Sequence, residues 1–483
     1  MTGRVLVASN RGPVRFVEED GDLVAKRGAG GLVTALAPAV QETGGLWMAS
    51  AMGTEDRRKA AESPDGRLEI VLEDAKYQLR LLSFDEETYE RAYNVISNRL
   101  LWFLHHYLWD LPRSPALLGD TTEAWEAYRT YNRTYAEALA EDVGDTPTDV
   151  LVQDYHLMLV PEELRRLAPR ARIAYFHHIP FAGQDYMRIL PQWLRDQLLT
   201  GLLGADVVGF QWERWAENFL VSCRLLEGAD VDPARGQVTW QGRVVRVGVY
   251  PISIDAEALR ASAASPEVRR RRRAIENWRA GRALVLRVDR AELSKNVFRG
   301  FQAFGDFLTR YPEWRRRVVF LALLQPSRRS LPEYRAYTEE FLAAAERINA
   351  EFRETGWAPI EVRVNDDFEE ALAAYGLYDV LMVNSLMDGM NLVAKEGPVI
   401  NRRAGSLILS RNAGATAELG EHALGVDPLD VMGTADAVHA ALEMPQEERA
   451  QRARALRRAA AAITPAEWAA RQIRDLEQAA NDA

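Results

Sequence analysis

Residues 380–396 read Val-Leu-Met-Val-Asn-Ser-Leu-Met-Asp-Gly-Met-Asn-Leu-Val-Ala-Lys-Glu, and this stretch decides the fold class. Its first four residues are apolar, which is typical of a short buried strand. A polar loop follows, and the spacing from Leu392 onward indicates a helix. A strand, a loop and a helix in this order are the repeating unit of a parallel sheet covered by helices.

The same unit recurs in two successive series along the chain. The first has apolar runs at 5–9, 150–153, 173–176 and 207–210, and the second has runs at 284–288, 318–324, 360–364, 380–383, 407–409 and 423–426. Two such series predict an α/β protein with two Rossmann-like, doubly wound domains. We expect an N-terminal domain at 1–250 and a C-terminal domain at 251–463. A helix at 464–483 is expected to pack back on the N-terminal domain.

The composition excludes several classes of protein. The 483 residues are 47% hydrophobic and 27% charged, with a net charge of −10, which is typical of a globular protein and unfavourable for nucleic-acid binding. Asp206 interrupts the longest apolar stretch, so no transmembrane helix is expected. The N-terminus lacks a signal-peptide pattern and Cys223 is the only cysteine, which predicts a cytoplasmic protein without a disulfide. The sequence leaves assembly into a homo-oligomer open.

Two cationic side chains follow the predicted strand at 284–288. Arg290 and Lys295 stand at a strand-to-helix turn, where they could hold a diphosphate and neutralise it as it leaves. Two exposed basic residues are the alternative. In the loop after the strand at 380–383, Asp388 could accept hydrogen bonds from sugar hydroxyls, and Glu396 could clamp a ribose diol. An aspartate cap with a helical glutamate is the alternative there.

Polar residues also follow the strands of the N-terminal domain. Arg11 is a candidate phosphate ligand, and the glycine-rich segment 28–31 is either a phosphate-binding loop or a tight turn. His178 follows another strand, but the histidine spacing does not match a zinc site, so we expect no metal. Tyr93 and Trp102 lie on a predicted helix, on different faces if the helix is an α-helix, and serve either as core or as stacking surfaces for a sugar.

Together these segments resemble the trehalose-6-phosphate synthase family of retaining glycosyltransferases. The matching blocks follow the family's order: Ser9-Asn10-Arg11, Gly30-Gly31-Leu32, Tyr93-Asn94, Ser97-Asn98, Leu101-Trp102, Gln153-Asp154-Tyr155-His156-Leu157, His178-Ile179-Pro180-Phe181, Arg290, Ser294-Lys295 and Asp388 to Glu396. The resemblance implies two Rossmann-like domains that face each other across a deep cleft, the GT-B arrangement. It also implies transfer of glucose, with retention, from a nucleoside-diphosphate glucose to glucose 6-phosphate, without a metal or another cofactor.

The resemblance further implies a role for each matching residue. The implied donor-binding residues are Gly31, Arg290, Lys295, Asp388, Gly389, Met390, Asn391, Leu392, Val393 and Glu396, and the implied acceptor-binding residues are Arg11, Trp47, Tyr93, Trp102, Asp154 and Arg328. Arg290 and Lys295 would grip the diphosphate. Asp388 and His178 would hold the transferred glucose, and Asp154 would face the reacting hydroxyl of the acceptor. These five residues form the expected catalytic set.

The chain departs from the family pattern around both C-terminal motifs. Ala291-Glu292-Leu293 stands where Leu-Asp-Tyr is common, and Asn296 stands where glycine is common. Such departures resemble an actinobacterial-type branch and weaken the case for uridine. Asp366, after the strand at 360–364, could pair with the N1–H and amino group of guanine, which favours GDP-glucose over UDP-glucose as the donor. Helix capping is the alternative role for the acids at this position.

Three other functions stay open at this point. A related pseudo-glycosyltransferase would act on an aminocyclitol phosphate, and another glucosyltransferase would use glycerol 3-phosphate as its acceptor. A non-catalytic sugar-phosphate sensor is the third, but the presence of Arg290, Lys295 and Asp388 favours an enzyme.

Overall fold

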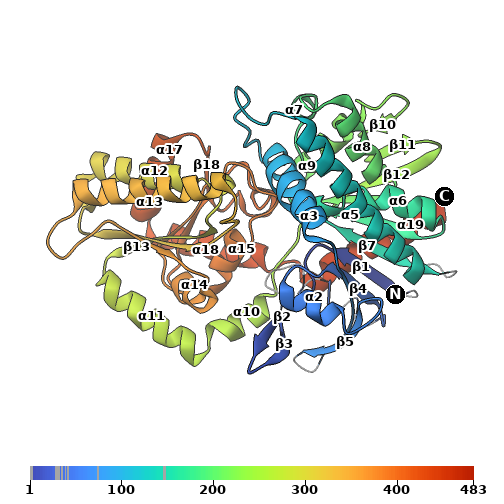
Figure 1. Ribbon diagram of the computed structural model, residues 1–483. Helices are drawn as coiled ribbons and strands as arrows, with labels where there is room; N and C mark the ends of the chain where they lie inside the picture. Colours follow the sequence, from blue (N-terminus) through green and yellow to red (C-terminus); the bar gives the residue numbers. More distant parts are fainter. Residues whose placement is uncertain are drawn as a thin grey trace. The chain divides into compact units, whose positions relative to one another are not determined.

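The protein consists of two compact units (Figure 1). The computed structural model describes residues 4–27, 33, 36–37, 40, 43–72, 75–144 and 148–482. Unit 1 comprises Met1–Ile252 and Pro465–Ala483, and unit 2 comprises Ser253–Thr464. Unit 2 is therefore one continuous segment, whereas unit 1 contains both ends of the chain.

Unit 1 is built on a ten-stranded sheet in the order β10-β11-β12-β9-β8-β7-β1-β4-β6-β5. Its strands are β1 (Val5–Ser9), β4 (Leu46–Ser50), β5 (Arg67–Leu72), β6 (Ala75–Leu82), β7 (Asp149–Gln153), β8 (Arg172–His177), β9 (Val207–Phe210), β10 (Asp230–Asp232), β11 (Gln237–Trp240) and β12 (Arg243–Val249). The inner pairs are parallel, and the pairs β5–β6, β10–β11 and β11–β12 are antiparallel. The strand order reverses at β1, which lies between β4 and β7. Ligands of doubly wound sheets bind beyond the strand ends at such a reversal.

Helices and a hairpin complete unit 1. The hairpin is β2 (Val14–Glu19) with β3 (Asp22–Arg27), and the helices are α2 (Thr54–Ala60), α3 (Glu86–Glu90), η1 (Arg91–Leu101), α4 (Trp102–His105), α5 (Gly119–Val143), η2 (Tyr155–Leu157), α6 (Val160–Leu167), α7 (Gln184–Met187), α8 (Gln192–Leu203), α9 (Glu213–Cys223) and α19 (Pro465–Asp482). Helix α19 packs on β8 and β9. Its buried Trp468 donates to the Tyr250 carbonyl oxygen (2.9 Å), and Tyr250 donates to Asp475 (2.6 Å), so the end of the chain is anchored to the sheet.

Unit 2 is built on a six-stranded parallel sheet in the order β15-β14-β13-β16-β17-β18. Its strands are β13 (Ala283–Arg290), β14 (Val318–Gln325), β15 (Ile360–Val364), β16 (Val380–Val383), β17 (Ser406–Ser410) and β18 (Leu424–Val426). The order reverses at β13, which pairs with β14 on one side and β16 on the other. The segments that follow β13 and β16, which carry Lys295 and Asp388, therefore start side by side.

Helices accompany the unit 2 strands along the chain. They are α10 (Ala256–Ala263), α11 (Pro266–Arg279), η3 (Leu293–Lys295), α12 (Val297–Arg310), η4 (Pro312–Trp314), α13 (Pro332–Phe352), α14 (Phe368–Tyr375), α15 (Val393–Ile400), α16 (Thr416–Leu419), α17 (Val431–Glu443) and α18 (Gln446–Ala460). Strands β14, β16 and β17 are almost wholly buried, as expected for a parallel sheet that is covered on both faces. The predicted fold class, α/β with two Rossmann-like, doubly wound domains, is confirmed.

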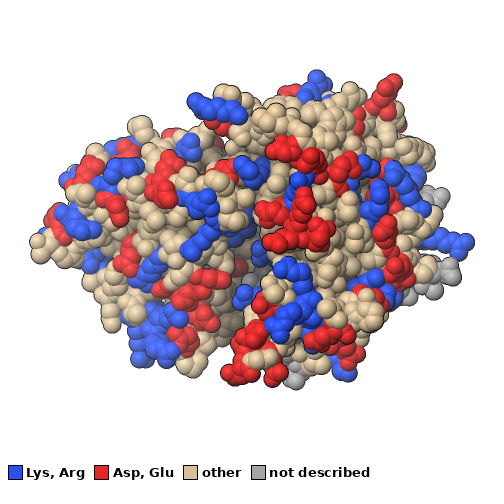
Figure 2. All heavy atoms as spheres, viewed as in Figure 1, with Lys and Arg blue, Asp and Glu red and all other residues tan. Residues whose placement is uncertain are grey.

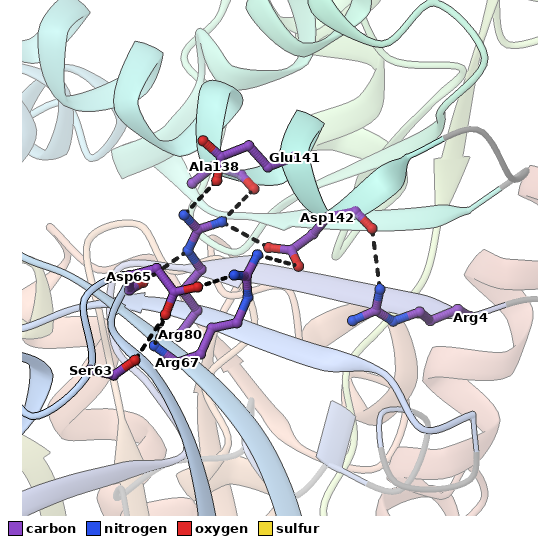
Figure 3. Close-up of polar contacts among 8 residues, drawn as sticks. All are labelled: Arg4, Ser63, Asp65, Arg67, Arg80, Ala138, Glu141 and Asp142. Carbon is purple, nitrogen blue, oxygen red and sulfur yellow. Dashed lines mark hydrogen bonds and ion pairs between the residues drawn. The ribbon is translucent and has the colours of Figure 1, made fainter.

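Arg80 ties helix α5 to the edge of the unit 1 sheet (Figure 3). Its side chain is buried, donates to the Ala138 carbonyl oxygen (2.9 Å), and forms ion pairs with Asp142 (2.9 Å) and Glu141 (2.7 Å). Arg67 pairs with the same Asp142 (3.0 Å). These acceptors belong to the last turns of α5, so the two cations also compensate the negative end of the helix dipole.

The surface carries charges of both signs. On the face drawn in Figure 2, acidic and basic side chains are interspersed, so the net negative charge is not gathered there in one patch. None of the helices in the described part of the chain is long and apolar enough to cross a bilayer.

Candidate active site

Lys295 occupies the turn between β13 and α12 in unit 2. Its Nζ lies 2.5 Å from Asp388 Oδ2, and its side chain is 12% exposed. Burial lowers the pKa of Lys295, but the carboxylates of Asp388 and Asp289 outweigh burial and raise the pKa above its usual value. The amine is therefore protonated at neutral pH, and the structure brings together two predicted site residues that are far apart in the sequence.

Arg287, which the sequence analysis did not single out, stabilises this turn from the buried interior of unit 2. Its fully buried side chain pairs with Asp289 (3.0 Å) and donates to the Lys295 carbonyl oxygen (2.9 Å) and to Asn384. Asn296 adopts the left-handed conformation (φ +58°) and donates to the Asn384 carbonyl oxygen (3.0 Å). Because asparagine tolerates this conformation better than most residues, the turn forms without the glycine that is common at this position.

Arg290 and Arg328 share one carboxylate, that of Glu292. Glu292 Oε1 lies 2.7 Å from Arg290 Nη1 and 3.5 Å from Arg328 Nη1, and it accepts a hydrogen bond from Ser327 (2.7 Å). Burial raises the pKa of Glu292, but Arg290, Arg328 and Lys295 together lower it to about 2. Sequence reasoning missed Glu292 as a site residue, although a carboxylate between two predicted phosphate-binding cations was a usable signal.

The loop at 388–391 is held rigidly at the start of α15. Asp388 donates its N–H to the Asn412 carbonyl oxygen (3.1 Å), and its own carbonyl oxygen accepts from Gly414 (3.1 Å). Asn391, at φ +78°, donates to Asp388 Oδ2 (3.0 Å) and accepts from the Ala394 N–H (3.2 Å). The positive end of the helix dipole lies at this loop, so this end of α15 favours an anion.

Helix α15 also carries Glu396, which is half-buried. Tyr375 donates to Glu396 Oε2 (3.1 Å), and burial raises the pKa of the Glu396 carboxyl. The preceding residue, Lys395, is fully buried and forms an ion pair with Glu418 (2.6 Å). The buried ion pair anchors the helix that carries Glu396.

In unit 1, Arg11 follows β1 and interacts with Tyr93. Burial lowers the pKa of Arg11, but the charge interaction and hydrogen bond with Tyr93 raise it overall. The Tyr93 ring stacks on His156, with 5.6 Å between ring centroids, and Trp102 contacts the neighbouring Tyr155, with 5.7 Å between centroids. Tyr93 and Trp102 therefore pack against two consecutive residues, His156 and Tyr155.

This arrangement differs from the α-helical expectation because η1 is a π-helix. Its hydrogen bonds join residues five apart, so its turns are wider than those of an α-helix. The wider turn brings Tyr93 and Trp102 toward one side, although their spacing places them on different faces of an α-helix. Long π-helical segments are rare and often occur at functional sites.

Asp154 follows β7 in a strained conformation, with φ +75° and ψ 168°. This region is essentially restricted to glycine, and strain of this kind clusters at functional sites. Asp154 Oδ1 accepts from the backbone N–H of His178 (3.1 Å), and His178 Nε2 lies 2.9 Å from Gln153 Oε1. Burial lowers the pKa of His178 to about 3, so the imidazole is neutral at physiological pH.

Trp47 does not line this part of unit 1. Its ring is fully buried, and its indole N–H donates to Ser9 Oγ (2.8 Å), which in turn donates to the Arg11 carbonyl oxygen (2.6 Å). With no exposed surface, Trp47 cannot contact an acceptor in this conformation and instead supports the segment that carries Arg11. Gly31 lies outside the described residues.

One of the two acids after β15, Asp367, has a structural role. Asp367 caps α14 by accepting the Glu370 N–H (2.9 Å), and it pairs with Arg271. Its neighbour Asp366 is exposed. Helix capping, the alternative raised for these acids, thus accounts for Asp367 but not for Asp366.

Comparison with known proteins places the chain in one family. The model of glycosyltransferase family 20 matches residues 3–478. A trehalose-6-phosphate synthase of Mycobacterium marinum is 35% identical over 475 residues, which cover 96% of this chain and 92% of that protein. The UDP-forming alpha,alpha-trehalose-phosphate synthase A of Dictyostelium discoideum is 31% identical over 486 residues, which cover 100% of this chain and 63% of that longer protein.

A solved structure agrees with the sequence relatives. The UDP-forming alpha,alpha-trehalose-phosphate synthase of Burkholderia xenovorans, in complex with glucose-6-phosphate, superposes with a TM-score of 0.85 at 28% identity and covers 98% of this chain and 100% of that one. The resemblance carried by the motifs is thereby confirmed, and the chain belongs to glycosyltransferase family 20.

Proposed function

We propose that the protein transfers glucose, with retention, from a nucleoside-diphosphate glucose to glucose 6-phosphate, forming α,α-trehalose 6-phosphate and a nucleoside diphosphate. The observation that carries this proposal is the cationic cluster at the strand-order reversal of unit 2, where Lys295 meets Asp388 and Arg290 meets Glu292. The names of the relatives and the glucose-6-phosphate complex of the Burkholderia enzyme support the same reaction.

The chemistry of the reaction matches such a cluster. When the glycosidic bond to the donor breaks, negative charge develops on the departing diphosphate. Lys295 is protonated and Arg290 presents a side chain that is 43% exposed, so both can stabilise this charge. We propose that they do so without a metal, and that Glu396 holds the ribose while Asp388 holds the transferred glucose.

Unit 1 is proposed to bind the acceptor. Arg11 and Tyr93 would take its phosphate, and Arg328 keeps the acceptor-phosphate role that its motif implies. Asp154 would face the reacting hydroxyl, and the neutral His178 would contact the glucose that is transferred. The strained backbone of Asp154 and the hydrogen bond from the His178 N–H support this pairing of roles.

The donor base is proposed to be uracil. The preference for GDP-glucose inferred from Asp366 has no support, because the Dictyostelium and Burkholderia relatives are both named UDP-forming. A cytoplasmic location stays a prediction from the sequence.

The test is a panel of donors and acceptors with the products identified. We expect release of nucleoside diphosphate from UDP-glucose that depends on glucose 6-phosphate, at a rate that a chelator does not change. A higher kcat/KM with GDP-glucose would reverse the assignment of the base. Turnover only with glycerol 3-phosphate or an aminocyclitol phosphate would establish one of the alternative reactions, and binding without turnover would establish a sensor.

A further inference from the structure

Glu292 is the one carboxylate of unit 2 that contacts two of the proposed phosphate-binding arginines. It lies between the end of β13, which carries Arg290, and the short helix η3, which carries Lys295. Its Oε1 receives Arg290 (2.7 Å), Ser327 (2.7 Å) and Arg328 (3.5 Å), and its side chain is fully buried. A single oxygen thus fixes one nitrogen of each guanidinium group.

The charges around Glu292 explain why such a carboxylate is needed. The cluster joins four positive side chains (Arg287, Arg290, Lys295 and Arg328) and three negative ones (Asp289, Glu292 and Asp388), so one positive charge remains for a ligand. Without Glu292, the like charges would repel each other and the long arginine side chains would spread over many conformations. Arg290 is nevertheless 43% exposed, so an anion can still reach its side chain.

The hydrogen bonding of Glu292 favours a role beyond stability. Among the described residues, none donates a hydrogen bond to the buried Oε2 atom, although Oε1 receives several donors. A carboxylate retained only for packing would be expected to have both oxygens satisfied. The unequal hydrogen bonding of Oε1 and Oε2 therefore indicates that the contacts with the two arginines set the position of the Glu292 carboxylate.

We propose that Glu292 is a positioning residue that couples Arg290 to Arg328, and thereby aligns the donor-diphosphate contact with the acceptor-phosphate contact. The inference rests on the proposed function for the identity of the two ligands. Glu292 itself contacts neither ligand in this account and acts only through the two arginines.

The decisive experiment is a double-mutant cycle. The variants are Glu292→Gln, which keeps the shape but removes the charge, Arg290→Ala, and the double variant, each in the full-length chain. We measure UDP affinity by calorimetry and kcat and KM for UDP-glucose and glucose 6-phosphate. Glu292→Gln is expected to lower kcat/KM by about ten- to a hundredfold. The kcat/KM of the double variant is expected to be no more than about twofold below that of Arg290→Ala, because both substitutions disrupt the same Glu292–Arg290 interaction.

Two further variants separate positioning from stability. Glu292→Asp keeps the negative charge, and aspartate is common at this position in the family. This variant should therefore retain a kcat/KM within about threefold of the wild-type value. Asp379→Asn is the matched control, since Asp379 is a buried carboxylate that accepts from Leu284 (2.9 Å) at the other end of β13 and pairs with Arg403 (3.1 Å). It should lower the melting temperature and leave both KM values unchanged.

A second cycle keeps Glu292 intact in case Glu292→Gln does not fold. Arg290→Ala and Arg328→Ala, alone and combined, should be non-additive in UDP affinity by more than about twofold, because each change alters how Glu292 holds the other arginine. Additive effects in the cycles, or a Glu292→Gln variant with wild-type kcat/KM, would overturn the inference.

The outcomes also distinguish the inference from the proposed function. If wild-type protein releases nucleoside diphosphate but the cycles are additive, the reaction stands and the coupling is wrong. If wild-type protein binds UDP with non-additive cycles but forms no trehalose 6-phosphate, the coupling stands and the reaction is wrong. If it does neither, both are overturned.

Discussion

At the residue scale, the candidate site depends on charges that are held by opposite charges. Lys295 is protonated because Asp388 and Asp289 compensate its burial, and Glu292 is ionised because Arg290 and Arg328 compensate its burial. Each of these groups would be unfavourable alone in a partly buried site. The arrangement keeps cations in place before a phosphate arrives, so little reorganisation is needed when charge develops.

Replacing Lys295 by glutamine tests its proposed role directly. The amide can still donate to Asp388 (2.5 Å from Nζ in the wild type), but the charge that stabilises the leaving diphosphate is lost. We expect kcat to fall by about a hundred- to a thousandfold. Lys76→Gln is the matched control, because Lys76 is 73% exposed and pairs only weakly with Glu69 at 3.4 Å, and it should keep wild-type kinetics.

The pH dependence of stability should report the charge of Glu292. Its pKa is about 2 in the folded protein against an ordinary value of 4.5, so ionisation favours the folded state. The contribution, about 3 kcal/mol in full, is complete above pH 4.5 and is lost as the pH falls toward 2. In urea unfolding between pH 3 and pH 6, the stability difference between wild type and Glu292→Gln should therefore shrink at the acidic end. A difference that stays constant over this range would mean that the pKa of Glu292 is not lowered in the folded protein.

The strain at Asp154 gives a prediction that two substitutions resolve. Both Asp154→Gly and Asp154→Ala remove the carboxylate that accepts from His178, so both should lose activity. Only glycine relaxes at φ +75° and ψ 168°, so the glycine variant should be more stable than the alanine variant by about 1–3 kcal/mol. Equal unfolding free energies for the two variants would show that the backbone there is unstrained.

At the element scale, the strands of unit 2 could be predicted almost completely and those of unit 1 could not. The predicted runs at 318–324 and 380–383 match β14 and β16, because strands covered on both faces are continuously apolar. Strand β6 was not predicted, because charged and polar residues alternate with its apolar ones. The rare π-helix η1 was likewise hidden from an analysis based on α-helical spacing.

The junction between α5 and the sheet edge supplies a test at this scale. Asp142, whose side chain is 6% exposed, pairs with Arg80 and Arg67, whereas Glu141 pairs with Arg80 from a side chain that is 62% exposed (Figure 3). Removing one partner of a buried ion pair costs about 3–5 kcal/mol, and an exposed pair contributes at most about 1 kcal/mol. Asp142→Ala should therefore lower the urea midpoint far more than Glu141→Ala, while both keep wild-type KM values. Equal decreases of the urea midpoint in the two variants would mean that the Asp142 ion pairs contribute no more to stability than the exposed Glu141 ion pair.

At the scale of the whole molecule, the chain order makes the two units unequal. Unit 2 is a continuous segment with its own sheet and core, whereas unit 1 needs α19 from the end of the chain to cover β8 and β9. We expect residues 253–464, expressed alone, to fold cooperatively and to bind UDP, because the cationic cluster lies wholly within them. Calorimetry and thermal unfolding check this. A truncated chain ending at 464 should in contrast leave unit 1 less stable, since Trp468 and its bond to Tyr250 are lost.

The sequence by itself determined the α/β class and the family, because short apolar runs and the polar motifs at strand ends are local features that can be recognised without knowing which segments lie next to each other. Only the tertiary structure decided that Lys295 meets Asp388, that Trp47 is buried and donates to Ser9, and that Glu292 joins two arginines. These relations depend on strand order and on the reversals at β1 and β13, which place distant segments side by side and which no local pattern records.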